Sequence, residues 1–117
     1  SSAASDVYKR QENWTSTRDC GSFLSQVYAG TLVSKNASER MMQLLLGQTR
    51  RTKIPAGVPS GVKVANKTGE LAAVQNDVAI VFGTHPYVLA VMSNDISSAV
   101  APSQITELSR AVWDAAQ

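Results

Sequence analysis

The sequence predicts an α+β domain in which helices pack against a three-stranded antiparallel sheet. The first half of the chain holds two helical apolar patterns, each preceded by a capping box. The second half holds two continuously apolar strands joined by a short linker, and a third helical pattern closes the chain. Helices that follow or precede a run of antiparallel strands favour a layered arrangement around one core. The 117 residues suffice for one such domain.

The first helix is expected at 17–29. The segment 16–19, Ser-Thr-Arg-Asp, reads as its capping box, and Gly30 provides the stop. The residues at helical spacing in this segment are Phe23, Leu24, Val27 and Tyr28. A second box at 36–39, Asn-Ala-Ser-Glu, opens another helix that continues to Gly47.

Two prolines and two glycines fall within residues 54–61, a density that excludes both a helix and a sheet ladder and predicts a loop. Alternation predicts a first strand over 62–65. The runs 78–82 and 87–92 are apolar throughout, which is typical of strands covered on both faces. A last helix over 103–115 follows Pro102. Its expected apolar stripe consists of Ile105, Leu108, Val112 and Trp113. Three modest helices give little cover for two such strands, so we expect part of the apolar surface to remain open.

Residues 1–11 are mostly small and polar and lack periodicity, so we expect a non-native or disordered leader there and a domain at 12–117. Hydrophobic residues make up 44% and charged residues 17%, with a net charge of +2. These values favour a globular chain and argue against a nucleic-acid partner. No apolar run reaches the roughly 18 residues of a membrane span. We expect no metal and no cofactor.

Several residues outside the strands are expected to have structural and not catalytic roles. Cys20 is the one cysteine, which excludes an internal disulfide, and we expect a buried thiol. His85 is expected to be a solvated turn residue, and Trp14 and Trp113 to be packing residues. The basic group of Arg50, Arg51 and Lys53 is expected to lie in a solvated loop.

The triplet Lys67-Thr68-Gly69 stands at the end of the first predicted strand. A strand edge can pair with an extended substrate, and a glycine lets a ligand approach the backbone closely. The lysine offers a positive charge and the threonine a hydroxyl, both suited to a carboxylate. Taken alone, the triplet is better explained as a surface lysine and a turn glycine at a strand end.

The triplet resembles the Lys-Thr-Gly motif of penicillin-binding proteins and class A β-lactamases. Segments 13–19, 54–59, 76–81 and 87–93 are similar, in the same order, to segments around that motif in this family. The resemblance covers about residues 13 to 116. The chain therefore resembles the C-terminal portion of a class A β-lactamase-like serine hydrolase of the penicillin-binding protein/β-lactamase superfamily. This resemblance implies that its α+β fold is the C-terminal part of a β-lactamase/transpeptidase-like fold.

This resemblance implies a substrate that is a β-lactam or a D-alanyl peptide, bound by Lys67, Thr68 and Gly69. It implies that the backbone amide of Glu70 is one oxyanion donor. It also implies an extracytoplasmic location, periplasmic or secreted, although no signal peptide is evident. The strands 77–82 and 87–93 hold no arginine, so binding of a substrate carboxylate is expected at Lys67, at Thr68 or outside the chain.

We expect the chain to lack the motifs Ser-x-x-Lys and Ser-Asp-Asn, and hence to contain no catalytic residue. The nucleophile would then come from a missing N-terminal half of the same domain, and this chain alone would be inactive. The alternative is a module that binds cell-wall peptides or β-lactams without cleaving them. The sequence does not separate a β-lactamase from a D-alanyl peptidase, because the deacylating base would lie before Asn13.

Overall fold

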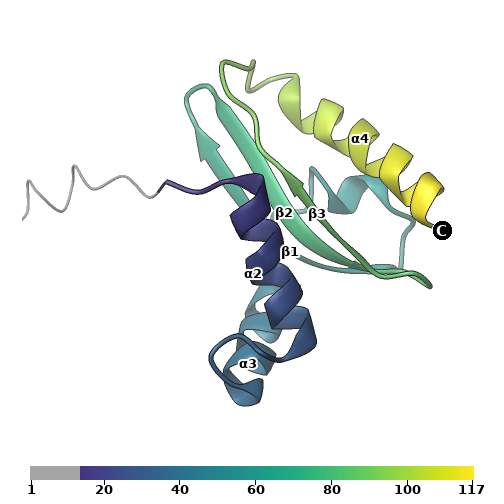
Figure 1. The fold of residues 1–117 in the computed structure, drawn as a ribbon. Coiled ribbons are helices and arrows are strands. Elements are labelled where there is room, and N and C mark those ends of the chain that lie inside the picture. The colour runs from purple at the N-terminus through teal and green to yellow at the C-terminus, as the bar shows by residue number, and fades with distance from the viewer. Residues whose placement is uncertain (1–13) are drawn as a thin grey trace, which may run out of the picture.

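The computed structural model describes residues 14–117; the expected leader lies outside this range. The chain folds as an α+β domain, as predicted, and its elements follow one another as shown in Figure 1. They are α2 (Thr17–Ala29), α3 (Lys35–Leu46), η1 (Pro55–Gly57), β1 (Lys63–Leu71), β2 (Val74–Phe82), β3 (Tyr87–Val91) and α4 (Ala101–Ala116). Within the described range, no helix has the length and apolarity needed to cross a membrane.

The sheet forms the middle of three layers. Helices α2 and α3 pack on one face, and η1 and α4 pack on the other (Figure 1). Each face has its own core of buried side chains. The core under α4 consists of Ile54, Val64, Ala79, Val81 and Ile105, and the core under α2 consists of Leu24, Val27, Ala65 and Ile80. The prediction that the second strand is covered on both faces is therefore confirmed.

The sheet is antiparallel throughout, with strand order β1-β2-β3. β1 is longer than the predicted strand at 62–65, because the polar residues 66–70 pair with 75–79 as regularly as the apolar ones before them. Backbone ladder bonds do not depend on apolar side chains, which is why an alternation pattern missed this half of the strand. Lys67 and Gly69 consequently lie inside β1 and not at its end.

Serine side chains cap the first two helices. Ser16 Oγ accepts a hydrogen bond of 3.1 Å from the Asp19 amide, as the capping box predicted. The predicted start of α3 at Asn36 was wrong, since Ser34 is the capping residue and accepts from the Ala37 amide at 3.0 Å. Ser38, expected in the box, instead turns inward and donates to the Leu32 carbonyl at 2.9 Å.

The segment 54–61 contains a short 3₁₀ turn, so the expectation that it excludes helix was wrong. Pro55 occupies the first position of this turn, where its missing N–H has no partner to lose. Gly57 lies so close to α4 that a Cβ there would stand 2.5 Å from the Thr106 carbonyl oxygen. This approach turns Ser109 into the interface and leaves Leu108, expected in the stripe, 46% exposed.

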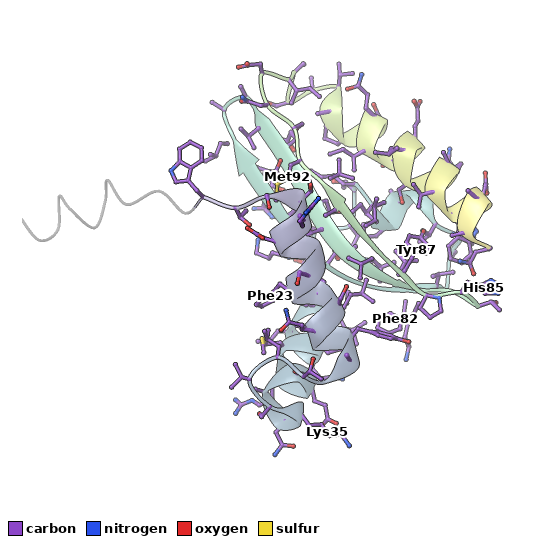
Figure 2. All side chains as sticks on the ribbon, viewed as in Figure 1. Phe23, Lys35, Phe82, His85, Tyr87 and Met92 are labelled. Carbon is purple, nitrogen blue, oxygen red and sulfur yellow. The ribbon has the colours of Figure 1, made fainter. Side chains whose placement is uncertain are left out.

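Cover is thinnest over β3, whose five residues are all half-buried. A surface hollow lies between α2 and β3 and is lined by Thr17, Arg18, Gly21, Ser25, Val88 and Ala90. Phe23 (labelled in Figure 2) and Tyr28 of α2 remain about half exposed. The ring of Tyr28 packs against that of Phe82, with 5.9 Å between the ring centroids and an angle of 45° between the ring planes. Trp14 is 86% exposed, so its expected packing role was wrong, whereas Trp113 packs against the core under α4.

Candidate functional site

The triplet Lys67-Thr68-Gly69 lies in β1, an outer strand of the sheet in the described range. Its partners across the ladder are Val78, Asp77 and Asn76 of β2. The side of β1 away from β2 carries no further strand among residues 14–117. The predicted substrate-binding residues are therefore brought to a free strand edge, where an extended ligand can pair with the backbone.

Successive side chains of β1 point to opposite faces of the sheet. Val64 belongs to the core under α4 and Ala65 to the core under α2. The alternation then places Thr68 and Glu70 on the face of α4 and η1, and Lys67 on the face of α2. Lys67 is exposed, and its ammonium donates a hydrogen bond to the Thr68 carbonyl. The ammonium of Lys67 and the hydroxyl of Thr68 therefore lie on opposite faces of the strand.

A basic pair from the loop before η1 meets the carboxylate of Glu70. Lys53 Nζ lies 2.9 Å from Glu70 Oε1 and 3.1 Å from the Asn76 carbonyl oxygen, and the Lys53 side chain is only 3% exposed. Arg50 Nη1 lies 3.1 Å from Glu70 Oε2. Burial alone would raise the pKa of Glu70, but hydrogen bonding to Lys53 and the charges of Lys53 and Arg50 outweigh it and lower the pKa below 4.5.

Next to this pair lies a fully buried carboxylate, Asp77 of β2. Its Oδ2 accepts from the Ile54 amide at 2.9 Å and its Oδ1 from Asn66 Nδ2 at 3.1 Å. Burial raises the pKa of Asp77 above 3.8, and the bonds from Asn66 and Ile54 offset only part of that effect. Asp77 and Lys53 together fasten the loop before η1 to the β1–β2 hairpin that carries the triplet.

Two polar atoms in this region are buried without a hydrogen-bond partner, Thr68 Oγ1 and Asn66 Oδ1. The Thr68 hydroxyl lies near enough to Glu70 to help lower the pKa of that carboxyl, but not in hydrogen-bonding geometry. An unpaired buried hydroxyl costs free energy that a suitable ligand atom can recover. Thr68 therefore has unused capacity to bind a polar group.

The expectation of a solvated basic loop holds for Arg50 and Arg51 and was wrong for Lys53, which is buried. The sequence analysis missed Lys53, Asn66 and Asp77 as parts of this region. A usable signal existed for the last two, since each is a polar residue that directly adjoins a buried apolar strand run. Nothing in the sequence predicts that Lys53, and not Arg50 or Arg51, is the buried cation of this loop.

The expectation that no serine has a lysine three positions on was wrong. The segment 60–63, Ser-Gly-Val-Lys, has that spacing. Ser60 lies in a turn, Gly61 has a φ of 90°, and Lys63 begins β1. Spacing of three brings side chains together on a helix, and this segment is not helical. Both Ser60 and Lys63 are exposed. No Ser-Asp-Asn occurs in the 117 residues.

The remaining candidates lie elsewhere. His85 is exposed in the β2–β3 hairpin, as predicted (Figure 2). Its amide donates to Gln117 Oε1 at 3.0 Å. Cys20 is half-buried, so its expected full burial was wrong. Across residues 14–117, no group of three or more histidine, cysteine, aspartate or glutamate side chains is placed to hold a metal ion.

Comparison with known proteins gives one consistent result. The model of the β-lactamase enzyme family matches residues 1–116. A β-lactamase from Sphaerobacter thermophilus has a similar structure, with a TM-score of 0.85 and 25% identity over 92% of this chain and 43% of that protein. The structure of PBP-A is similar too, with a TM-score of 0.79 and 27% identity over 86% of this chain and 39% of that protein.

The chain thus spans about two-fifths of the length of these solved structures. A reconstructed ancestral class A β-lactamase shares the fold at a TM-score of 0.70 and 22% identity, covering 81% of this chain and 39% of that one. A search of curated proteins gives no significant match. Since the family model matches nearly the whole sequence, and the sheet with its flanking helices is that of the solved relatives, the chain belongs to the β-lactamase enzyme family.

Proposed function

We propose that this chain is the C-terminal part of a serine hydrolase that cleaves β-lactams or D-alanyl peptides through an acyl-serine intermediate. It supplies one wall of the active site, and the nucleophile comes from the rest of the domain. The observation that carries the proposal is the position of Lys67-Thr68-Gly69 on the free edge of β1, in a sheet similar to that of PBP-A. A variant of PBP-A is described as an acyl-enzyme complex with penicillin G, which supports this substrate class.

The chemistry of amide cleavage requires a nucleophile, a base and donors for the oxyanion. The free edge of β1 can hold an extended acyl group by strand pairing. Gly69 has no side chain, and the nearest atom to a Cβ built there is 3.7 Å away, so the ligand meets backbone at this point. In this arrangement the ammonium of Lys67 provides positive charge on one face of the edge. The Glu70 amide acts as one oxyanion donor, and the nucleophile's own amide as the other.

The catalytic residues themselves lie outside this chain in our proposal. Ser60 stands in an exposed turn without a base held beside it, so it does not take the nucleophile's role. The domain works outside the cytoplasm, where D-alanyl peptides and β-lactams are encountered. Neither a metal nor another cofactor takes part.

A chimera tests this proposal directly. The part of the Sphaerobacter thermophilus β-lactamase that this chain does not cover is joined to residues 14–117, and the product is incubated with benzylpenicillin. Intact-mass analysis is expected to show a covalent penicilloyl adduct or turnover. Lys67→Ala is expected to reduce the acylation rate at least tenfold, whereas Lys63→Ala, at the start of the same strand, leaves it unchanged. A folded chimera that is never acylated would refute the proposal.

The alternative is a module that binds cell-wall peptides or β-lactams without cleaving them. One observation favours it: both sheet faces already carry helices and a buried core of their own. This alternative requires reversible, saturable binding of a D-alanyl peptide to the 117-residue chain, without an adduct and with loss of binding in Lys67→Ala. If such binding is absent and the chimera is active, the serine hydrolase is favoured over the binding module.

A further inference from the structure

We propose that helix α3 is a movable element that opens away from β1, about the turn at residues 30–34, while the rest of the domain stays folded. Backbone strain at Val33 favours the opening, because that strain is relieved when α3 leaves the sheet. The opening uncovers the part of β1 that precedes Lys67-Thr68-Gly69. This inference goes beyond the proposed function and requires no nucleophile.

Val33, in the turn between α2 and α3, has an unfavourable backbone conformation. Its φ is 62°, and the Ser34 amide donates to the Leu32 carbonyl oxygen at 2.7 Å across it. A three-residue turn with a positive φ at its centre is the rare, strained form of the γ-turn. Asp95 also has a positive φ, of 53°, but aspartate tolerates this region, whereas a β-branched residue does not.

The helices on either side hold this strained turn in place. The chain must turn within residues 30–34 for α2 and α3 to rest on the same face of the sheet. Ser34 caps α3, and the buried hydroxyl of Ser38 donates to the Leu32 carbonyl oxygen at 2.9 Å. Backbone strain persists only where the surrounding structure imposes it. Release of α3 from the sheet removes the constraint on the turn and therefore lets Val33 relax.

Helix α3 is held to the sheet more weakly than α2 or α4. Its one buried residue is Ser38, which bonds to the turn and not to the sheet. In contrast, α2 buries Leu24 and Val27, and α4 buries Ala101 and Ile105. The side chains of α3 that reach the core under α2 are all half-buried: Met41, Met42, Leu45 and Leu46. Segments with few buried apolar contacts are those that open locally in native proteins.

The position of α3 links its opening to the strand that carries the triplet. α3 packs against β1 on the face of the sheet away from α4 (Figure 1). On that face β1 presents Ala65, which is fully buried in the core that α3 helps to cover. Lys67 follows two residues later, and alternation places it on the same face. Opening of α3 therefore exposes the strand directly beside Lys67.

Thiol labelling of the full chain tests the proposal. In a Cys20→Ser background, Ala65→Cys introduces a thiol in the core under α2 and α3, and Val64→Cys introduces one in the core under α4. The rate of reaction with dithionitrobenzoate is compared with the rate that the global unfolding of the same variant allows. Ala65→Cys is expected to react at least about tenfold faster than global unfolding allows, and Val64→Cys at the rate of global unfolding. Reaction of both thiols through global unfolding alone would overturn the proposal.

Two substitutions at Val33 test the role of strain. The Val33 side chain is 89% exposed, so neither substitution removes a buried contact. Val33→Asn introduces a residue that tolerates the left-handed region, whereas Val33→Thr keeps the β-branch and makes a similar change in polarity. Combined with Ala65→Cys, Val33→Asn is expected to slow labelling at least about fivefold, and Val33→Thr to leave it unchanged. Equal labelling rates in the two variants would contradict strain as the cause of the opening.

Hydrogen exchange provides a second measurement that avoids the added sulfur atom of Ala65→Cys and replaces labelling if that variant does not fold. In the unsubstituted chain, the hydrogen-bonded amides of α3 are expected to exchange at least about tenfold faster than the slowest amides of β2, and with a smaller dependence on urea. Val33→Asn is expected to slow the α3 amides, and Val33→Thr is not. If α3 and β2 show the same exchange free energy and the same urea dependence, α3 opens only with the whole domain and the proposal is refuted.

Discussion

The ammonium of Lys53 lies 2.9 Å from Glu70 Oε1 and 3.1 Å from the main-chain oxygen of Asn76. One buried side chain therefore joins the loop before η1 to both strands of the hairpin that carries Lys67-Thr68-Gly69. Asp77 makes a second connection through the Ile54 amide. These contacts hold the free edge of β1 in place on the side where no further strand of the described range supports it.

Lys53→Met is expected to destabilise the fold, because methionine fills the space but leaves the Glu70 carboxylate and the Asn76 carbonyl without their buried donor. Breaking a fully buried ion pair costs roughly 3–5 kcal/mol, and the partial exposure of Glu70 reduces the expected loss to about 2 kcal/mol. Urea unfolding measures it, with Lys63→Met at the exposed start of β1 as the control. Equal stability of the two variants would show that the buried contact contributes nothing.

The stability of the chain is expected to fall on acidification, and Glu70 is expected to be one cause. Its pKa is lowered in the folded chain, so its contribution is full above 4.5 and is lost as the pH falls through the lower, folded value. Asp77 acts in the opposite sense. Its pKa is raised in the folded chain, so its ionisation lowers the free energy of unfolding. This loss grows as the pH rises from 3.8 toward the higher, folded value.

Glu70→Gln removes the first effect and keeps the second. The difference between the free energies of unfolding at pH 7 and pH 3 is therefore expected to be smaller in Glu70→Gln than in the unsubstituted chain. Glu39→Gln, which changes an exposed acid of α3, serves as the control. If the loss of stability between pH 7 and pH 3 is the same in all three proteins, Glu70 is not one of its causes.

The fold was largely predictable because its elements are local patterns. The helix at 17–29 has a capping serine, an apolar stripe and a terminal glycine, and the structure reproduces these bounds. The last helix and both apolar strands were also found within a few residues. The errors come from tertiary contacts, as at Leu108, where the close approach of Gly57 to α4 decides which side chain turns inward.

The candidate site was predictable only in its motif. The Lys-Thr-Gly triplet is contiguous in sequence, so it could be recognised from its similarity to the motif of the family. Lys53 and Glu70 are 17 residues apart, and no periodicity relates a loop cation to a strand carboxylate. Their pairing depends on how η1 folds over the sheet, which follows from the packing of Gly57 against Ser109 and not from a local pattern.

Gly57→Ala is expected to destabilise the chain by about 2 kcal/mol or more, since the new methyl group would stand 2.5 Å from the Thr106 oxygen and 2.6 Å from Ser109 Cβ. Backbone and a helix-bound side chain cannot yield easily at this contact. Gly21→Ala is the matched control, because nothing lies within 4 Å of a Cβ there. That change in helix α2 is expected to stabilise by about 0.5–1 kcal/mol. Thermal unfolding of both variants checks the pair, and a tolerated Gly57→Ala would mean that η1 and α4 are less closely packed than described.

The 117-residue chain alone is expected to form no covalent adduct with benzylpenicillin. The reason is geometric: Ser60 and Lys63 have the spacing of a nucleophile motif, but they lie in a turn and at the start of a strand, where spacing of three does not set two side chains together. Intact-mass analysis after prolonged incubation measures the adduct, with Ser60→Ala run in parallel. A stoichiometric adduct that disappears in Ser60→Ala would make Ser60 a nucleophile and would overturn the assignment of catalysis to the rest of the domain. An adduct that persists in Ser60→Ala would place the reactive group elsewhere in this chain, and would contradict that assignment equally.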